Sequence, residues 1–202
     1  VFGKKLADFF IKLGYEKKLV TTFHYVDTDY YKPGVEKKPT GFKVIHIGSL
    51  KRNFCMLQEI VNACPDIEFH ICQGNKDLSS YFKQNRNIKL YGYLKEPELL
   101  TLMQSCHISL NVIDDTVGSN VITTSMACGL VNVVSDVGSV RDYCSPEDSV
   151  LCKDVNDFIN ALYYLKNKKE VLSAKSVKAR DKAMSFSIES FGKWFQQNIF
   201  SI

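Results

Sequence analysis

Residues 43–53 read KVIHIGSLKRN, an apolar run that ends in a glycine and leads to an asparagine. The run Lys43–Ile47 is rich in β-branched residues and predicts a strand covered on both faces. Asn53 is a good N-cap, the apolar residues after it fall on one helical stripe, and Pro65 ends that stripe. This stretch therefore predicts a strand, a loop and a helix in direct succession.

The same succession recurs along the chain. Strands are predicted at Lys18–Phe23, Lys43–Ile47, Ile67–Cys72, Ile88–Tyr91, His107–Val112, Val131–Ser135 and Ser149–Cys152. Helices are predicted around Phe2–Leu13, after Asn53, from Pro97, from Ser119 or Asn120 to Gly129, from Asp154, and over about Lys169–Met184 and Ser187–Phe200. Apolar strands that alternate with helices favour an α/β fold, a Rossmann-like doubly wound parallel sheet with right-handed crossovers.

The chain divides into three predicted parts. Residues 1–41 hold the leading helix and strand and end in the hydrophilic linker Lys32–Gly41. Residues 42–185 form the α/β domain, and residues 186–202 form a last helix with an apolar stripe. The chain starts VFGKK, without an initiator Met or a signal peptide, so we expect it to be part of a longer protein.

Composition excludes several classes of protein. Of the 202 residues, 45% are hydrophobic and 24% charged, which is ordinary for a globular protein and excludes disorder, coiled coil and collagen. A net charge of +4 is too mild to indicate nucleic-acid binding by itself. Seven Cys without a C-x-x-C pair favour free thiols in a reducing compartment over a disulfide framework or a zinc site. No apolar run approaches the ~18 residues of a membrane span.

Three loops that follow predicted strands are candidate binding loops, because ligands of open α/β sheets bind at the carboxyl ends of the strands. The first, Gly48–Asn53, combines a glycine, Lys51, Arg52 and a helix start, which suits a phosphate; a solvated turn is the alternative. Neither G-x-G-x-x-G nor a P-loop motif is present, so dinucleotide and P-loop functions are disfavoured.

The other two loops are also rich in small polar residues. Asp114–Asn120 leads into the helix Val121–Cys128, and its Gly-Ser-Asn suits a sugar or a phosphate, although simple helix capping explains it as well. Its two Asp lack partners at metal-ligand spacing. Ser135–Asp142 contains Arg141, and an Asp-anchored turn is the alternative to a binding role there. The strand histidines His46 and His70 are interpreted as core residues.

Several stretches resemble the family-4 retaining glycosyltransferases. Residues 124–139, TSMACGLVNVVSDVGS, resemble the family pattern E-A-M-A-C-G-x-P-V-V-A-S-D-V-G-G. Val20–Pro33 resembles the inter-domain segment that ends N-G-V-D-x-x-x-F-x-P. Gly48–Arg52 resembles the G-R-L-x-x-x-K-G loop, and Gly92–Leu94 the G-x-V loop. Order and spacing match over nearly the whole chain.

The resemblance implies a GT-B arrangement of two Rossmann-like halves, of which this chain would be the C-terminal, donor-binding half. It implies transfer of a hexose-type sugar from a nucleotide-diphosphate sugar to a glycan acceptor, without a metal or another cofactor. The partners implied are the donor, the acceptor and a missing N-terminal acceptor domain, toward which residues 186–202 would cross. The expected setting is bacterial surface-polysaccharide synthesis, in the cytoplasm, with peripheral contact at the inner face of the membrane through the missing domain.

The resemblance also assigns the binding residues and shows where this chain departs from the pattern. Donor contacts are expected at Gly48, Ser49, Lys51, Arg52, Thr116, Gly118, Ser119, Asn120, Val121 and Thr124. The family's two glutamates, which contact the donor sugar and the ribose, align on Thr116 and Thr124, and the loop's usual Arg falls on Ser49. The alternative function is therefore a catalytically degenerate nucleotide-sugar-binding module. A flavin or redox domain is disfavoured because no dinucleotide motif is present. By itself, the chain is expected to bind the donor without transferring the sugar.

Overall fold

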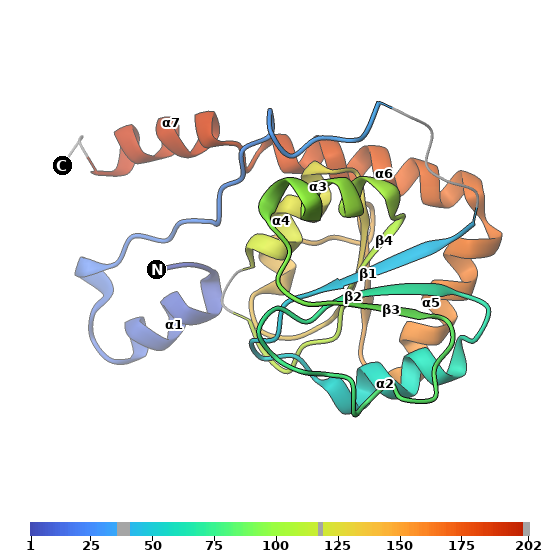
Figure 1. The fold of residues 1–202 in the computed structure, drawn as a ribbon. Coiled ribbons are helices and arrows are strands. Elements are labelled where there is room, and N and C mark those ends of the chain that lie inside the picture. The colour runs from blue at the N-terminus through green and yellow to red at the C-terminus, as the bar shows by residue number, and fades with distance from the viewer. Residues whose placement is uncertain (36–40, 117–118, 200–202) are drawn as a thin grey trace.

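A computed structural model describes residues 1–35, 41–116 and 119–199 of the chain (Figure 1). Its centre is a six-stranded sheet in the order β3-β2-β1-β4-β5-β6, in which every neighbouring pair is parallel. The strands are β1 (Lys43–Ile47), β2 (Glu68–Cys72), β3 (Ile88–Tyr91), β4 (Ile108–Asn111), β5 (Val131–Ser135) and β6 (Ser149–Cys152). This order is that of a Rossmann fold, and it confirms the α/β fold class expected from the sequence.

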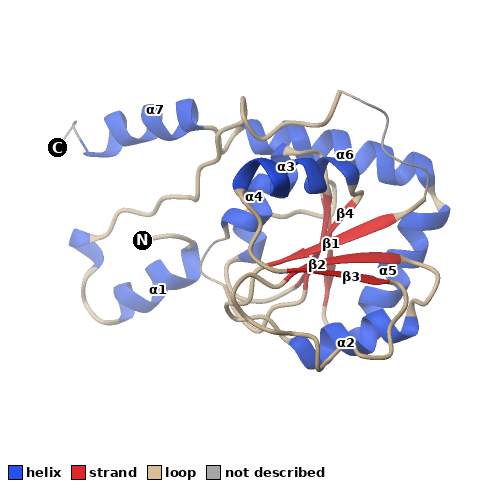
Figure 2. Cartoon of the chain, viewed as in Figure 1, coloured by secondary structure: helices blue, strands red, loops and turns tan. Residues whose placement is uncertain are grey.

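Helices cover both faces of the sheet (Figure 2). On one face, α2 (Phe54–Ala63) and α5 (Val155–Asn167) pack against each other. On the other lie α3 (Glu96–Ser105), α4 (Asn120–Ala127) and α6 (Lys169–Met184), of which α4 and α6 are neighbours. Successive residues of a strand therefore pack on opposite helical layers. Val44 belongs to the core under α2 and α5, and Ile45 to the core under α3.

The residues expected to start and stop the helices do so. Asn53 Oδ1 accepts a hydrogen bond from the Met56 amide (2.9 Å), and Asp154 Oδ1 accepts one from the Asp157 amide (3.0 Å). Each satisfies a backbone donor that has no partner inside the helix. Gly129 follows α4 with φ of 72°, a left-handed conformation that glycine adopts without strain. Local capping and apolar periodicity are therefore sufficient to set these boundaries.

The prediction of a strand at Lys18–Phe23 is wrong. A short 3₁₀ turn covers Glu16–Lys18, and the only pairing nearby is an isolated bridge between Thr22 and Phe2. The segment runs beside the sheet domain rather than along an edge strand (Figure 1), so its backbone has no strand to pair with. A run of residues with high β-propensity forms a strand only beside a partner strand, and β-propensity does not show whether a partner is present.

The two ends of the chain lie on the same side of the sheet domain (Figure 1). There, α1 (Lys4–Lys12) precedes the irregular segment, and α7 (Ile188–Ile199) follows α6. The Val26 amide donates to the Phe186 carbonyl (2.8 Å), and the Ile188 amide donates to the Val26 carbonyl (3.2 Å). The segment that precedes the sheet domain and the segment that follows it are thus joined by backbone hydrogen bonds.

Aromatic packing reinforces this tie. The Phe23 ring lies 5.6 Å from the Phe186 ring, 6.0 Å from that of Phe191 and 6.4 Å from that of Trp194, measured between centroids. The outer side of α7 is left uncovered, and its apolar residues Ile188, Phe195 and Ile199 are exposed. Among the described residues, no helix is long and apolar enough to cross a membrane.

Candidate functional site

The candidate site lies where the strand order reverses. From β1 the sheet continues through β2 to β3, and from β4 it continues the opposite way through β5 to β6. The loops after β1 and β4 therefore diverge at their carboxyl ends, and open α/β sheets bind ligands in the crevice between such loops. Two of the three loops selected from the sequence, Gly48–Asn53 and Asp114–Asn120, start at this point.

Backbone and side-chain bonds join these two loops. The Asn53 amide donates to the Val112 carbonyl (3.1 Å), and the Asp114 amide donates to the Lys51 carbonyl (3.0 Å). Asn53 Nδ2 also donates to Asp114 Oδ1 (2.9 Å). Lys51 has φ of 55°, the only positive φ recorded for a non-glycine residue in the described ranges. The turn that carries the two cations is therefore held in a backbone conformation that disfavours lysine.

Arg52 and Lys51 differ in their surroundings. The Arg52 side chain is half-buried, and Nη2 donates to the Ile47 carbonyl (3.0 Å). Its Nε is buried without a hydrogen-bond partner among the described residues, and burial lowers the pKa of the guanidinium to about 10. Lys51 is exposed. The Arg52 guanidinium has no ion pair with any described residue, and together with exposed Lys51 it favours an anion as the ligand of this loop.

His46 lies below this loop but stays neutral. Its Nδ1 is 3.0 Å from the Leu110 carbonyl, which can only accept, so Nδ1 carries the proton. Burial, together with the positive charge of Arg52, lowers the pKa of His46 to about 3. The imidazole is therefore uncharged at neutral pH. The interpretation of His46 as a core residue agrees with this, although its Nε2 has no hydrogen-bond partner within the described part of the chain.

The second loop rests on the third. The Thr116 carbonyl accepts a hydrogen bond from the Ser139 amide (2.8 Å), and the Thr116 amide donates to Asp115 Oδ1 (2.8 Å). Gly138 has φ of 57°, and a Cβ added there would lie 2.2 Å from the Thr116 carbonyl oxygen. The sequence suggested the two loops separately and missed this contact. The glycine at position 138 was the available signal.

Arg141, the cation of the third loop, is used inside that loop. Its Nε donates to Asp136 Oδ1 (2.8 Å) and its Nη2 to Asp136 Oδ2 (2.6 Å). This bidentate pair lowers the pKa of the Asp136 carboxyl and matches the alternative of an Asp-anchored turn. The structure therefore joins the loop of Lys51 and Arg52 to Asp114, joins Thr116 to Ser139 of the third loop, and pairs Arg141 with Asp136.

The amino end of α4 supplies the remaining predicted residues. Ser119 is its N-cap, Asn120 is exposed and Val121 is partly exposed, while Gly118 lies outside the described residues. Thr124 Oγ1 donates to the Asn120 carbonyl (2.7 Å) and lies 3.3 Å from the Val121 carbonyl. The hydroxyl proton of Thr124 is thus committed within the helix, and only the oxygen lone pairs remain for a ligand.

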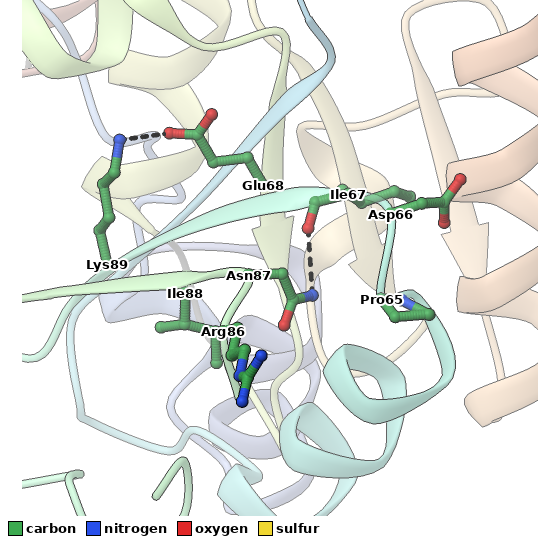
Figure 3. Close-up of a pocket in the computed structure, with 8 residues that line it drawn as sticks. All are labelled: Pro65, Asp66, Ile67, Glu68, Arg86, Asn87, Ile88 and Lys89. Carbon is green, nitrogen blue, oxygen red and sulfur yellow. Dashed lines mark hydrogen bonds and ion pairs between the residues drawn. The ribbon is translucent and has the colours of Figure 1, made fainter. Parts of the chain in front are cut away.

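A separate pocket of about 490 Å³ opens at the other end of the sheet (Figure 3). It lies at the amino ends of β2 and β3, between residues 65–68 and 86–89. Its Glu68 carboxylate binds Lys89 Nζ at 2.7 Å, and Asn87 Nδ2 donates to the Ile67 carbonyl at 3.1 Å. This pocket is distinct from the carboxyl-end loops and contains none of the residues selected from the sequence.

Comparison with known proteins assigns the family. The family described as "Glycosyl transferases group 1" matches residues 41–168, which include both loops of the candidate site. The chain belongs to this glycosyltransferase family. No curated protein matches the chain.

Solved structures share the fold. Sucrose-phosphate synthase from Thermosynechococcus elongatus superposes with a TM-score of 0.77 at 14% identity, covering 95% of this chain and 57% of its own. Anabaena HepE in complex with UDP-glucose gives 0.78 at 15% identity, covering 91% and 57%. The C-terminal domain of LpcC, a group 1 glycosyltransferase from Francisella tularensis, gives 0.68 at 15% identity, covering 81% and 99%. The chain thus spans little more than half the length of the first two, and their GT-B-type Rossmann fold is the one observed here.

Proposed function

We propose that the chain binds the nucleotide-diphosphate-sugar donor of a glycosyl transfer at the carboxyl ends of β1 and β4. Arg52 carries the proposal, because its guanidinium forms no ion pair with any described residue and lies in the loop where the strand order reverses. In this site Lys51, Arg52 and the amino end of α4 would stabilise the negative charge that develops on the leaving diphosphate. HepE, whose complexes contain UDP-glucose and UDP, supports a nucleotide sugar as the ligand class.

The test of this proposal is a charge deletion. Calorimetry with UDP, GDP and ADP first identifies the preferred base. The double variant Lys51→Ala and Arg52→Ala should then weaken the diphosphate about 10- to 100-fold, as expected for lost charge-assisted hydrogen bonds, and the free nucleoside far less. The matched control is Lys43→Ala with Lys89→Ala, two cations at the opposite end of the sheet, which should leave the affinity unchanged. Equal losses for diphosphate and nucleoside would exclude a phosphate role.

The finer assignment follows the sequence resemblance. We propose a family-4-type retaining enzyme that transfers a hexose-type sugar to a glycan acceptor without a metal or another cofactor. The chain would be its C-terminal half, as its coverage of the LpcC C-terminal domain suggests, and a second lobe would hold the acceptor. Surface-polysaccharide synthesis at the cytoplasmic face of a bacterial membrane is the setting we propose.

A binding module without catalysis is the second candidate, and Thr124 favours it. Its hydroxyl proton is used inside α4, and no carboxylate stands at position 116 or 124. Restoring both carboxylates with Thr116→Glu and Thr124→Glu separates the candidates when sugar transfer is assayed with the acceptor lobe present. Turnover by the wild-type chain would exclude the degenerate site, and turnover by the Glu variants alone would support it.

We further propose that the 202 residues bind a donor by themselves but do not transfer its sugar. Holding donor and acceptor in a reactive geometry contributes about 7–11 kcal/mol to catalysis, and the described residues offer only the donor side. Donor-dependent extension of a glycan acceptor by the isolated chain would contradict this and would require a single-domain mechanism.

A further inference from the structure

Arg180, in the carboxyl-terminal half of α6, binds backbone carbonyls from two separate segments. Its Nη1 donates to the carbonyl of Ala127, the last residue of α4 (2.8 Å), and to the carbonyl of Tyr31 (2.9 Å). Its Nη2 donates to the carbonyl of Thr28 (3.0 Å). A single half-buried guanidinium therefore joins Ala127 of α4 to residues 28–31, which lie 96 or more positions earlier in the sequence.

Two carbonyls at and just after the carboxyl end of α4, those of Ala127 and Gly129, accept hydrogen bonds from α6. Ser176 lies one turn before Arg180, on the same side of α6, and its Oγ donates to the Gly129 carbonyl (2.5 Å). Ala179 and Ala183 are buried in the core shared with α4, where their small side chains allow the two helices to approach. Helix-end carbonyls lack partners within the helix, and a cation there also interacts favourably with the helix dipole.

Residues 26–33 form a fixed frame for this contact. Tyr31 Oη donates to Glu96 Oε1 of α3 (2.5 Å), and Gln104 Nε2 of the same helix donates to the Lys32 carbonyl (2.9 Å). Val26 is paired with the backbone on both sides of Ser187. Because this segment is attached to α3 and to the start of α7, the bridge through Arg180 to the Ala127 carbonyl restrains α4 from outside the sheet.

The opposite end of α4 lies at the candidate donor site. The helix has only eight residues, about 12 Å at 1.5 Å per residue, so a shift of its carboxyl end moves the whole helix. Ser119, Asn120 and Val121 are at its amino end. Within the sheet domain, Ser125 Oγ donates to Ser109 Oγ (2.9 Å), and apolar packing supplies much of the remaining restraint.

We propose that Arg180 is a positioning residue for the donor site: by fixing the carboxyl end of α4 to residues 28–31, it sets where the amino end of α4 meets the diphosphate. This inference rests on the proposed function of that site. The planar fork of arginine is needed, because its separate N–H groups reach three carbonyls at once, whereas a lysine ammonium is a single point of contact.

The test compares Arg180→Met with Arg180→Lys and with a control from the same helix. Lys175 also donates from α6 to backbone carbonyls, those of Pro146 and Ser149, but it ties α6 to the start of β6 and the segment before it. UDP is the probe, or whichever of GDP and ADP the wild-type chain binds more tightly. Calorimetry at a temperature where all variants are folded should show about a tenfold loss of affinity for Arg180→Met and a smaller loss for Arg180→Lys. Lys175→Met should change the affinity less than twofold, even where it lowers the melting temperature as much.

The outcomes distinguish failure of the positioning role of Arg180 from failure of the proposed donor site. Wild-type binding that survives Arg180→Met, or that falls equally in Lys175→Met, overturns the positioning role and leaves the donor site standing. Absence of binding to any of the three diphosphates by the wild-type chain overturns both. Where Arg180→Met does not fold, Arg180→Lys carries the test against Lys175→Met, and equal affinities of these two variants count against the proposal.

Discussion

The amino ends of β2 and β3 and the loop after β1 treat charge in opposite ways. At the amino ends of the strands, Glu68 binds Lys89 at 2.7 Å and lies 3.9 Å from Lys43 and 3.0 Å from His70 Nε2. At the carboxyl ends, Lys51 and Arg52 form no ion pair with any residue that the structure describes. Charges paired within the chain stabilise the fold, while charges that the fold leaves unpaired are available to a ligand.

The same contrast applies to the two buried histidines. His70 has Tyr91 Oη at 2.8 Å from Nδ1, and the Glu68 carboxylate lies 3.0 Å from its Nε2. His46 has the Leu110 carbonyl 3.0 Å from Nδ1 and faces the Arg52 cation instead of a carboxylate. Burial lowers the pKa of both, but Glu68 opposes that shift for His70, whereas Arg52 adds to it for His46. Protonation of His46 is therefore disfavoured both by burial and by the charge of Arg52, whereas Glu68 favours protonation of His70.

The largest effect is expected from Gly138→Ala, which tests how tightly the carboxyl-end loops are packed. The new Cβ would meet the Thr116 carbonyl at 2.2 Å at a positive φ, so we expect a loss of about 2–4 kcal/mol in unfolding free energy. Gly74→Ala is the control, because Gly74 has φ of 62° with nothing within 4 Å of the added Cβ. Its cost should be about 1 kcal/mol. Equal losses in urea unfolding would mean that the contact between Thr116 and Gly138 is loose.

The pH dependence of stability should separate the two histidines. The folded pKa of His46, about 3, lies below its unfolded value near 6.5, so the unfolded chain binds the proton first. Stability is therefore full above pH 6.5 and falls as the pH drops from there toward 3, by at most about 1.4 kcal/mol per pH unit. His46→Asn keeps a donor for the Leu110 carbonyl and should flatten this slope between pH 6.5 and 4.

His70→Asn is the comparison for that measurement. The pKa of His70 is also lowered, which gives stability the same direction of pH dependence, but Glu68 opposes the shift. We therefore expect His70→Asn to flatten the slope less than His46→Asn does. A larger change for His70→Asn, in denaturant unfolding across this pH range, would reverse the assigned difference between the two ends of the sheet.

Lys51→Gly should move stability and binding in opposite directions. Glycine tolerates the φ of 55° at position 51, so the substitution should raise the unfolding free energy by about 0.5–1 kcal/mol. It also removes an exposed cation from the proposed diphosphate site, which should weaken nucleoside-diphosphate binding a few-fold. Lys51→Ala is the control, since it should lose the affinity without the gain in stability. A Lys51→Gly chain that binds as tightly as wild type would remove Lys51 from the site.

Much of this architecture was predictable from local sequence. Asn53, Asp154 and Gly129 begin or end helices through contacts with their own neighbours, and such short-range signals are legible without a structure. The strand at Lys18–Phe23 failed because a strand needs a partner that sequence does not identify. The candidate loops were found because strand ends and glycines mark them.

The links between these loops were not predictable. Asn53 contacts Asp114 across 61 residues, Thr116 accepts from Ser139, and Arg180 reaches Thr28 across 152 residues. Each is a contact between side chain and backbone, or between two loops, that depends on how the helices stack on the sheet. A periodicity places residues on a face but does not say which residue of another element they meet.

The smallest effect is expected from Glu68→Gln, which tests the amino end of the sheet. Glu68 is the shared partner of Lys43, His70 and Lys89, but its side chain is 35% exposed, so solvent screens these pairs. Glutamine keeps an acceptor for its neighbours, and we expect a loss of less than about 1 kcal/mol in unfolding free energy at low salt, declining as salt is added. Since the lowered pKa of Glu68 stabilises the fold only above its unfolded value near 4.5, the loss should vanish as the pH falls through the folded pKa. Nucleoside-diphosphate affinity should not change, because this cluster lies at the end of the sheet opposite to Lys51 and Arg52. A change in that affinity would show that charge at the two ends is coupled, and the division between fold-stabilising and ligand-directed charges would then not hold.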